Sequence, residues 1–254
     1  MDIFEDKENK ILVQTKNMLK TLFPIYSFGL ENILKTKDLL INDVENNIDI
    51  KYNKACLILL NSSIQHLESI KVLLQSGLYG DCFVLIRSLM SNIAMLQYLH
   101  FHPKLLDLFL KESLKDYQNN SEFKKNFNET AIEKDLESRG ISSFKKSFQI
   151  LSKTSHASSW GAQLYGVRGE VNQYFPTYGP TFDPEKATAI SVAIVSGHYD
   201  LISIVLWHRQ HTDLPIDSSE WDKVKANFHK LEIEISMFLN SALTILKTIV
   251  LILK

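Results

Sequence analysis

The chain has 254 residues, of which 45% are hydrophobic and 22% charged, and its 28 basic and 29 acidic side chains give a formal net charge of −1. This apolar fraction excludes an intrinsically disordered chain, and the near-zero net charge argues against a general polyanion binder. Only nine glycines and six prolines interrupt the chain, which favours a helical protein large enough to bury a sizeable core.

Neither the cysteines nor the chain ends indicate export or a membrane span. Cys56 and Cys82 both lie in apolar runs, which indicates small buried hydrophobes in a reducing cytoplasm rather than a disulfide. Residues 1–10 are acidic and polar, unlike a signal peptide. Residues 233–253 carry two charges, but polar residues interrupt them, so we expect a core or dimer-forming helix rather than a span. The expected location is therefore the cytoplasm.

Helical periodicity dominates the first part of the chain. Apolar residues recur at helical spacing over 11–22, before Pro24, and again over about 26–40. Residues 48–75 carry one apolar stripe, which Gly77 can close as a C-terminal cap. Three successive helices are therefore expected here.

The fourth predicted helix is the most apolar. Asp81 is its expected N-cap, and it runs to residue 101, ahead of Pro103. Its apolar residues cover more than one face, so this helix should be central in the fold.

Residues 104–140 change character, because basic and acidic side chains alternate as they do on solvated helices. Thr130 and Glu133 have the spacing of a capping box, and Gly140 is expected to end that helix. We interpret this region as a charged hairpin at the periphery.

After a short predicted helix over about 143–153, residues 154–182 do not have a helical pattern. This segment has only Arg168 and Glu170 as charges and contains four of the nine glycines. It is also rich in aromatic residues, namely Trp160, Tyr165, Tyr174, Phe175, Tyr178 and Phe182. A long aromatic and glycine-rich loop of this kind is often functional.

Two long helices complete the predicted fold. Asp183 as N-cap and Pro184 at the first position begin a helix that runs to about residue 211, and the last helix spans about 219–252. The sequence therefore predicts one all-α domain over 1–254, a single bundle of about eight to ten helices.

Sequence motifs for metals and cofactors are absent. There is no phosphate-binding loop, dinucleotide fingerprint or Cys-x-x-Cys pair, and no Glu is followed three residues later by His as in di-iron bundles. His100 and His102 should point apart on a helix, whereas His208 and His211 are either ligands or an ordinary polar helix end. His198 lies in an apolar run and should be a hydrogen-bonded core or interface histidine. We expect neither a metal nor a cofactor.

Arginine is scarce, and the four arginines differ in their settings. Arg87 is the only charged residue of the apolar helix after Asp81, and a guanidinium there must be paired or line a cavity. It is expected either to form a salt bridge with a neighbouring helix or to bind a ligand or act in catalysis. Arg139 should lie in the charged hairpin and Arg209 at a polar helix end, so that Arg87 alone is embedded. Tyr79 and Asp81, in the turn before Arg87, are candidate ligand-binding residues.

A second candidate site lies where the aromatic loop begins. His156 stands among hydroxyl residues, and an imidazole with a pKa near neutrality suits a general acid or base. The alternative is a helix-terminal histidine bonded to the backbone. The ligand-binding candidates from this segment are Ser155, Trp160, Tyr165 and Arg168.

Together these residues resemble a bacterial family of helical proteins known only as a domain of unknown function, with a glycine-rich turn, an Arg-x-x-x-Glu helix and a Ser-x-x-x-His segment. Here the three elements are residues 77–81, Arg87 and residues 152–156, and the resemblance covers roughly 50–165. The position four after the arginine is Ser91 instead of Glu. Either another acid supplies the charge, or the site is altered.

That family is in turn thought similar to the HEPN group of all-α proteins, many of which are ribonucleases in phage defence and toxin systems. The HEPN hallmark is an arginine and a histidine on one helix with four to six residues between them, and no arginine here has that spacing. A nuclease would require Arg87 and His156 to converge from different elements. His156 would then move protons and Arg87 would stabilise the developing charge without a metal.

Two functions are therefore open. The first is an interaction or ligand-binding component of a bacterial defence or stress module, acting as a homodimer or with a partner protein. The second is a HEPN-like ribonuclease with RNA as its substrate, which predicts that Arg87 and His156 line one cleft.

Overall fold

The protein is an all-α bundle. The computed structural model describes residues 3–111, 121–141, 167–168, 175–176, 182–212 and 219–252, with side chains over 9–111, 121–141, 182–212 and 219–240. This part of the chain contains nine α-helices and one short 3₁₀ helix, which agrees with the predicted bundle of eight to ten helices. The helices are α1 (Ile3–Met18), α2 (Leu22–Glu45), α3 (Ile50–Gln75), α4 (Tyr79–Phe101), η1 (Pro103–Leu105), α5 (Leu106–Lys111), α7 (Ser121–Asn126), α8 (Glu129–Ser138), α11 (Pro184–His211) and α12 (Ser219–Ile252).

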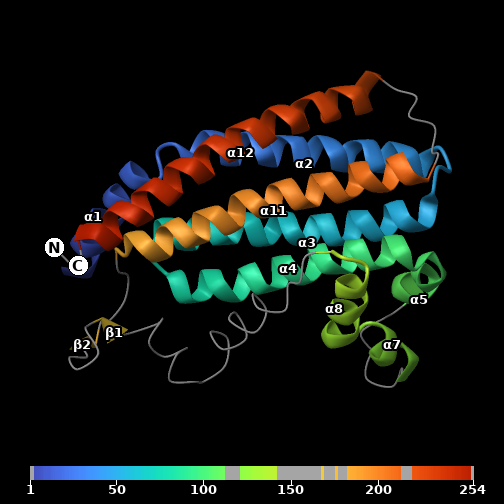
Figure 1. Ribbon diagram of the computed structural model, residues 1–254, viewed down its shortest axis with the longest axis horizontal. Helices are drawn as coiled ribbons and strands as arrows, with labels where there is room; N and C mark the ends of the chain where they lie inside the picture. Colours follow the sequence, from blue (N-terminus) through green and yellow to red (C-terminus); the bar gives the residue numbers. More distant parts are fainter. Residues whose placement is uncertain are drawn as a thin grey trace.

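Helix α11 lies at the centre of the bundle and packs against α2, α3, α4 and α12 (Figure 1). Helix α4 lies on the opposite side of α11 from α12 and contacts α3, α8 and α11, so the central position expected for it belongs to α11 instead (Figure 1). Both helices are long and apolar enough to cross a membrane by length and composition alone, but the interior helix of a bundle has the same composition.

Several helix boundaries follow the local sequence. Gly77 and Gly140 adopt positive φ angles of 72° and 75° just after α3 and α8, as expected for glycine caps. The side chain of Asp183 accepts a hydrogen bond from the backbone N–H of Lys186, and Pro184 opens α11.

Two predicted caps are wrong. The N-cap of α8 is Asn128, whose side chain accepts from the N–H of Ala131, so this helix begins before the Thr130 box. Helix α4 begins at Tyr79 rather than after Asp81, because apolar packing of its first turn extends it toward Gly77. Asp81 therefore lies in the first turn, where a negative charge favours the helix dipole.

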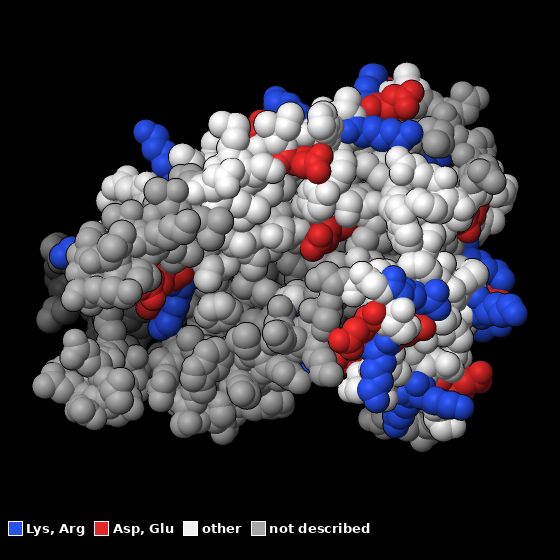
Figure 2. Space-filling view, viewed as in Figure 1, with Lys and Arg blue, Asp and Glu red and all other residues white. Residues whose placement is uncertain are grey.

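The predicted hairpin over 104–140 comprises η1, α5, α7 and α8. Figure 2 shows basic and acidic side chains mixed over this region, at the lower right of the view. A small apolar cluster attaches it to α4, with Ile132 and Leu136 of α8 against Ala94 and Tyr98. The outer surface of the hairpin is therefore charged, and this apolar cluster, which it shares with α4, anchors it to the bundle.

Within the predicted aromatic loop over 154–182, the described residues are two short strands and Phe182, which precedes α11. Strand β1 (Val167–Arg168) pairs with β2 (Phe175–Pro176) in antiparallel register. This agrees with the absence of a helical pattern in the sequence.

The expectation that Arg87 is the embedded arginine is wrong. The side chain of Arg209 is only 3% exposed and forms an ion pair with Asp43 of α2, whereas that of Arg87 is 28% exposed. The sequence did not reveal this, because Arg209 stands in a polar run at the end of α11, of which only His208 and Arg209 are buried while the next three residues are exposed. Arg139 lies on the hairpin as expected, in an ion pair with Asp135.

Candidate functional site

Arg87 joins α4 to the charged hairpin. Its Nη2 donates to Oε2 of Glu129 over 2.8 Å, and Ser91, one turn later on α4, donates to Oε1 of the same carboxylate over 3.1 Å. The acid expected on α4 itself is thus replaced by one from α8. Nε of Arg87 is buried and has no hydrogen-bond partner among the described residues.

The other predicted site residues are only partly brought together. Tyr79 is buried, and its hydroxyl accepts from the N–H of Asp183, which ties the start of α4 to the start of α11. Asp81 is exposed on the first turn of α4. Arg168 lies in β1, with its backbone alone described.

The remaining predicted site residues lie outside the described residues. These are Ser155, His156, Trp160 and Tyr165. The convergence of Arg87 with His156 therefore stays a prediction.

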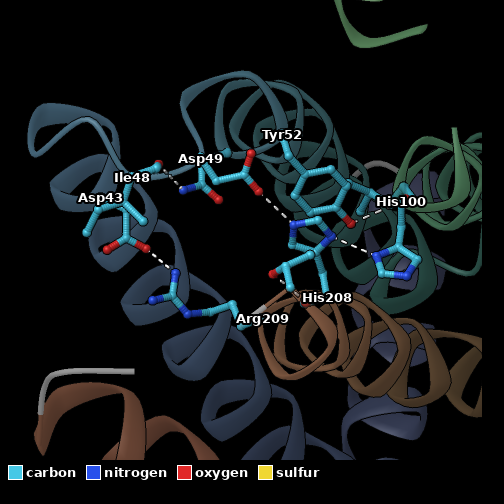
Figure 3. Close-up of polar contacts among 10 residues, drawn as sticks. Asp43, Ile48, Asp49, Tyr52, His100, His208 and Arg209 are labelled. Carbon is cyan, nitrogen blue, oxygen red and sulfur yellow. Dashed lines mark hydrogen bonds and ion pairs between the residues drawn. The ribbon is translucent and has the colours of Figure 1, made fainter. Parts of the chain in front are cut away.

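A different polar cluster forms where three helix ends meet, at the start of α3 and the last turns of α4 and α11. Oδ2 of Asp49 lies 2.7 Å from Nε2 of His208, and Nδ1 of His208 lies 2.7 Å from Nδ1 of His100. Figure 3 shows the three side chains connected in that order. We call this set the histidine chain.

The local conformation of Asp49 directs its carboxylate to this cluster. Asp49 occupies the N-cap position of α3, but its φ of 37° and ψ of 50° are left-handed and its side chain makes no capping hydrogen bond. Aspartate is a favoured capping residue and tolerates this conformation better than most residues. A capping residue is typical of a functional position when its backbone is strained and its side chain bonds a distant residue instead of the helix end.

The ring of His208 is held by a stacked tyrosine and by the anchored residue that follows it in α11. Tyr52 of α3 stacks on it with ring centroids 3.4 Å apart and an interplanar angle of 12°. The next residue, Arg209, pairs with Asp43 and lies over the ring of Trp221 at 4.0 Å. His208 is consequently 7% exposed and fixed in orientation.

A pocket of about 360 Å³ opens over the histidine chain. Its polar wall is formed by Asp49, His100, His208 and Thr212, and its remaining wall by Tyr52, Leu99, Pro103 and Leu106. A concave site with apolar walls and a few convergent polar groups is the usual form of a small-molecule site.

Electrostatics keep His100 neutral. Burial, and then the neighbouring His208 and His211, lower the pKa of His100 to about 4. At pH 7 its imidazole is therefore uncharged, with one nitrogen available as a hydrogen-bond acceptor. The described residues contain no group of three or more His, Cys, Asp or Glu side chains placed to hold a metal ion.

Sequence reasoning missed the histidine chain because its members are remote from one another. His100 and His208 are 108 positions apart, and Asp49 is 159 positions from His208. His100 and His102 do point apart as predicted, since His102 bonds Asp135 instead. The available signal was a histidine in the last turn of each of the two most apolar helices.

Residues 53–175 match a family of unknown function (DUF5677). This confirms the expected resemblance to an uncharacterised family over nearly the same residues. No curated protein and no solved structure matches the chain. The matched segment contains Arg87, Glu129 and His100, whereas Asp49 and His208 lie outside it.

Proposed function

We propose that the protein binds a small polar ligand in the pocket over the histidine chain. The observation that supports this proposal is that a buried imidazole (His208), a half-buried imidazole (His100) and the carboxylate of Asp49 are hydrogen-bonded in a row and line one 360 Å³ pocket together with apolar residues. Buried polar groups aligned in this way are costly unless they are satisfied, which favours a site with a defined hydrogen-bonding partner. The ligand carries a hydrogen-bond donor that meets the acceptor nitrogen of His100.

Substitution of Thr212, which is exposed and lines the pocket, tests this proposal. In a thermal-shift screen of small hydroxyl- and amine-bearing molecules, a ligand at about 100 times its Kd stabilises the protein by about 2.7 kcal/mol. This raises the Tm by roughly 5–10 °C for a chain of this size. Thr212→Trp fills the pocket and should abolish the shift.

The matched control is Thr21→Trp, which places the same ring in a separate pocket between α2 and α12 and should leave the shift intact. A screen without any ligand that shifts the Tm, or a shift that survives Thr212→Trp, would contradict the proposal.

The alternative function is a metal-independent ribonuclease that uses Arg87 and His156. The observation in its favour is the Arg87 guanidinium, which is 28% exposed and has a buried Nε without a partner among the described residues. Arg87→Ala should lower RNA cleavage by about 10²–10³-fold and His156→Ala by about 10²–10⁴-fold, with folding retained. Cleavage that persists in either variant, or a wild-type protein that leaves RNA intact, excludes this function.

For either function we infer, from the resemblance alone, a role in a bacterial defence or stress module in the cytoplasm. The proposed assembly is a homodimer or a complex with a partner protein. Size-exclusion chromatography with light scattering measures the molar mass in solution and so tests for the homodimer directly.

A further inference from the structure

The hydrogen bonds of the histidine chain determine which ring nitrogens carry protons. A carboxylate only accepts, so Nε2 of His208 donates to Asp49. In a neutral ring, Nδ1 of His208 is then an acceptor, and Nδ1 of His100 must donate across the 2.7 Å contact. Nε2 of His100 is left with a lone pair, and no partner for it lies within the described part of the chain.

We propose that Asp49, His208 and His100 form a proton relay that makes Nε2 of His100 a general base toward a hydroxyl-bearing substrate. This inference rests on the ligand pocket proposed above. When the substrate O–H bond breaks, its proton goes to Nε2 of His100, and the proton on Nδ1 of His100 passes to Nδ1 of His208. The electron pair stays on the substrate oxygen, and the positive charge resides on His208. The reverse transfer returns a proton to the product.

The surroundings of His208 stabilise the charge that the relay places there. Asp49 accepts a charge-assisted hydrogen bond over 2.7 Å, and the face of Tyr52 lies 3.4 Å from the imidazole centroid. His208 also stands in the last turn of α11, where the helix dipole favours a cation.

Without this transfer His100 would be a weak base. Burial, His208 and His211 lower the pKa of His100 to about 4, well below the neutral range in which a general base is most effective. Passing the proton onward separates the accepting atom, on a residue that lines the pocket, from the buried His208 that holds the charge. His100 is thus the catalytic residue, whereas Asp49 and His208 are positioning residues.

The first test reads the proton positions in the wild-type protein without any ligand. Proton–nitrogen correlation spectra of ¹⁵N-labelled histidine distinguish the two neutral forms of each ring. We expect the proton on Nδ1 in His100 and on Nε2 in His208. A His100 ring protonated on Nε2 would overturn the relay and leave the ligand pocket untouched, so the two proposals fail separately.

The second test measures the reactivity of His100 toward diethyl pyrocarbonate at pH 7 by peptide mass spectrometry. In this reaction Nε2 forms a bond to a carbonyl carbon, ethyl carbonate leaves, and the Nδ1 proton passes to His208. Because the relay needs the negative charge of Asp49, Asp49→Asn should slow the modification of His100 on the order of tenfold.

Asp135→Asn is the matched control, since it removes the carboxylate from the other histidine–aspartate pair, His102–Asp135. It should leave the rate at His100 unchanged. Equal rates in wild type and Asp49→Asn would overturn the proposal. If Asp49→Asn does not fold, the proton positions on His100 and His208 in the wild-type protein alone determine whether the relay stands.

Discussion

Replacement of Arg209 by alanine should lower the free energy of unfolding by about 3–5 kcal/mol, because it leaves the carboxylate of Asp43 buried without its counter-charge. The two side chains are 3% and 5% exposed, and Trp221 donates a further hydrogen bond to Asp43. Burial already raises the pKa of Asp43, although the charge of Arg209 acts to lower it. Urea unfolding at pH 7 measures the loss.

The control for this prediction is Arg139→Ala, which breaks the exposed pair with Asp135 on α8. A surface pair of this kind contributes about 1 kcal/mol or less, so a small change is expected. The double variant Asp43→Asn/Arg209→Met removes both charges and should be more stable than Arg209→Ala. Similar unfolding energies for Arg209→Ala and Arg139→Ala would show that the buried pair is not a major stabilising contact.

The pair of Asp43 with Arg209 also positions the candidate site. Arg209 follows His208 directly in the last turn of α11, and Asp43 and Asp49 flank the end of α2 and the start of α3. Two consecutive residues of α11 are thereby fixed to two acids of one connection (Figure 3). Loss of Arg209 should therefore also loosen the histidine chain.

The helices could be predicted because their determinants are local. The apolar spacing along α3 and α11, the glycine at position 77 and the Asp183–Pro184 start all act within one or two turns. Predictions failed where packing decided instead. Helix α4 begins before Asp81, and α2 begins at Leu22 rather than near residue 26, with Pro24 in its first turn, where proline is tolerated.

The candidate site could not be predicted, because it depends on which helix ends meet. Arg209 has polar neighbours in the sequence but buries its charge, since α2 supplies Asp43 across the bundle. Asp49 occupies the N-cap position of α3, yet its left-handed backbone directs its carboxylate to His208. Arg87 could be singled out as the one charge on an apolar helix, but the acid that pairs with it, Glu129, comes from another helix.

His198 should make the protein sensitive to mild acid. It is fully buried on α11, with Nδ1 donating to the carbonyl of Ile194 and Nε2 buried without a partner among the described residues. Its ring packs so closely on α2 that a Cβ at Gly29 would lie 2.8 Å from Cδ2 of the imidazole. The site therefore accommodates a neutral ring and, among the residues that the structure describes, offers no acceptor for a second proton.

Burial lowers the pKa of His198 to about 4, from about 6.5 in the unfolded chain. The stability that comes from the neutral ring is fully present above pH 6.5 and is lost as the pH falls toward 4, because the unfolded state then binds the proton more readily. The total loss is about 3 kcal/mol at 1.36 kcal/mol for each pKa unit. His100 acts in the same direction, whereas Asp200, whose pKa burial raises to about 6, acts in the opposite direction.

A comparison of variants isolates the contribution of His198. His198→Leu keeps an apolar side chain in the core and removes the titration, so its unfolding energy should fall by about 3 kcal/mol less than that of the wild type between pH 7 and 4. His229→Gln, at a position 75% exposed, should retain the wild-type pH dependence. The free energies of unfolding are measured by urea titration at pH 7, 5.5 and 4.5. If they fall equally with pH in His198→Leu and the wild type, the acid sensitivity arises elsewhere in the bundle.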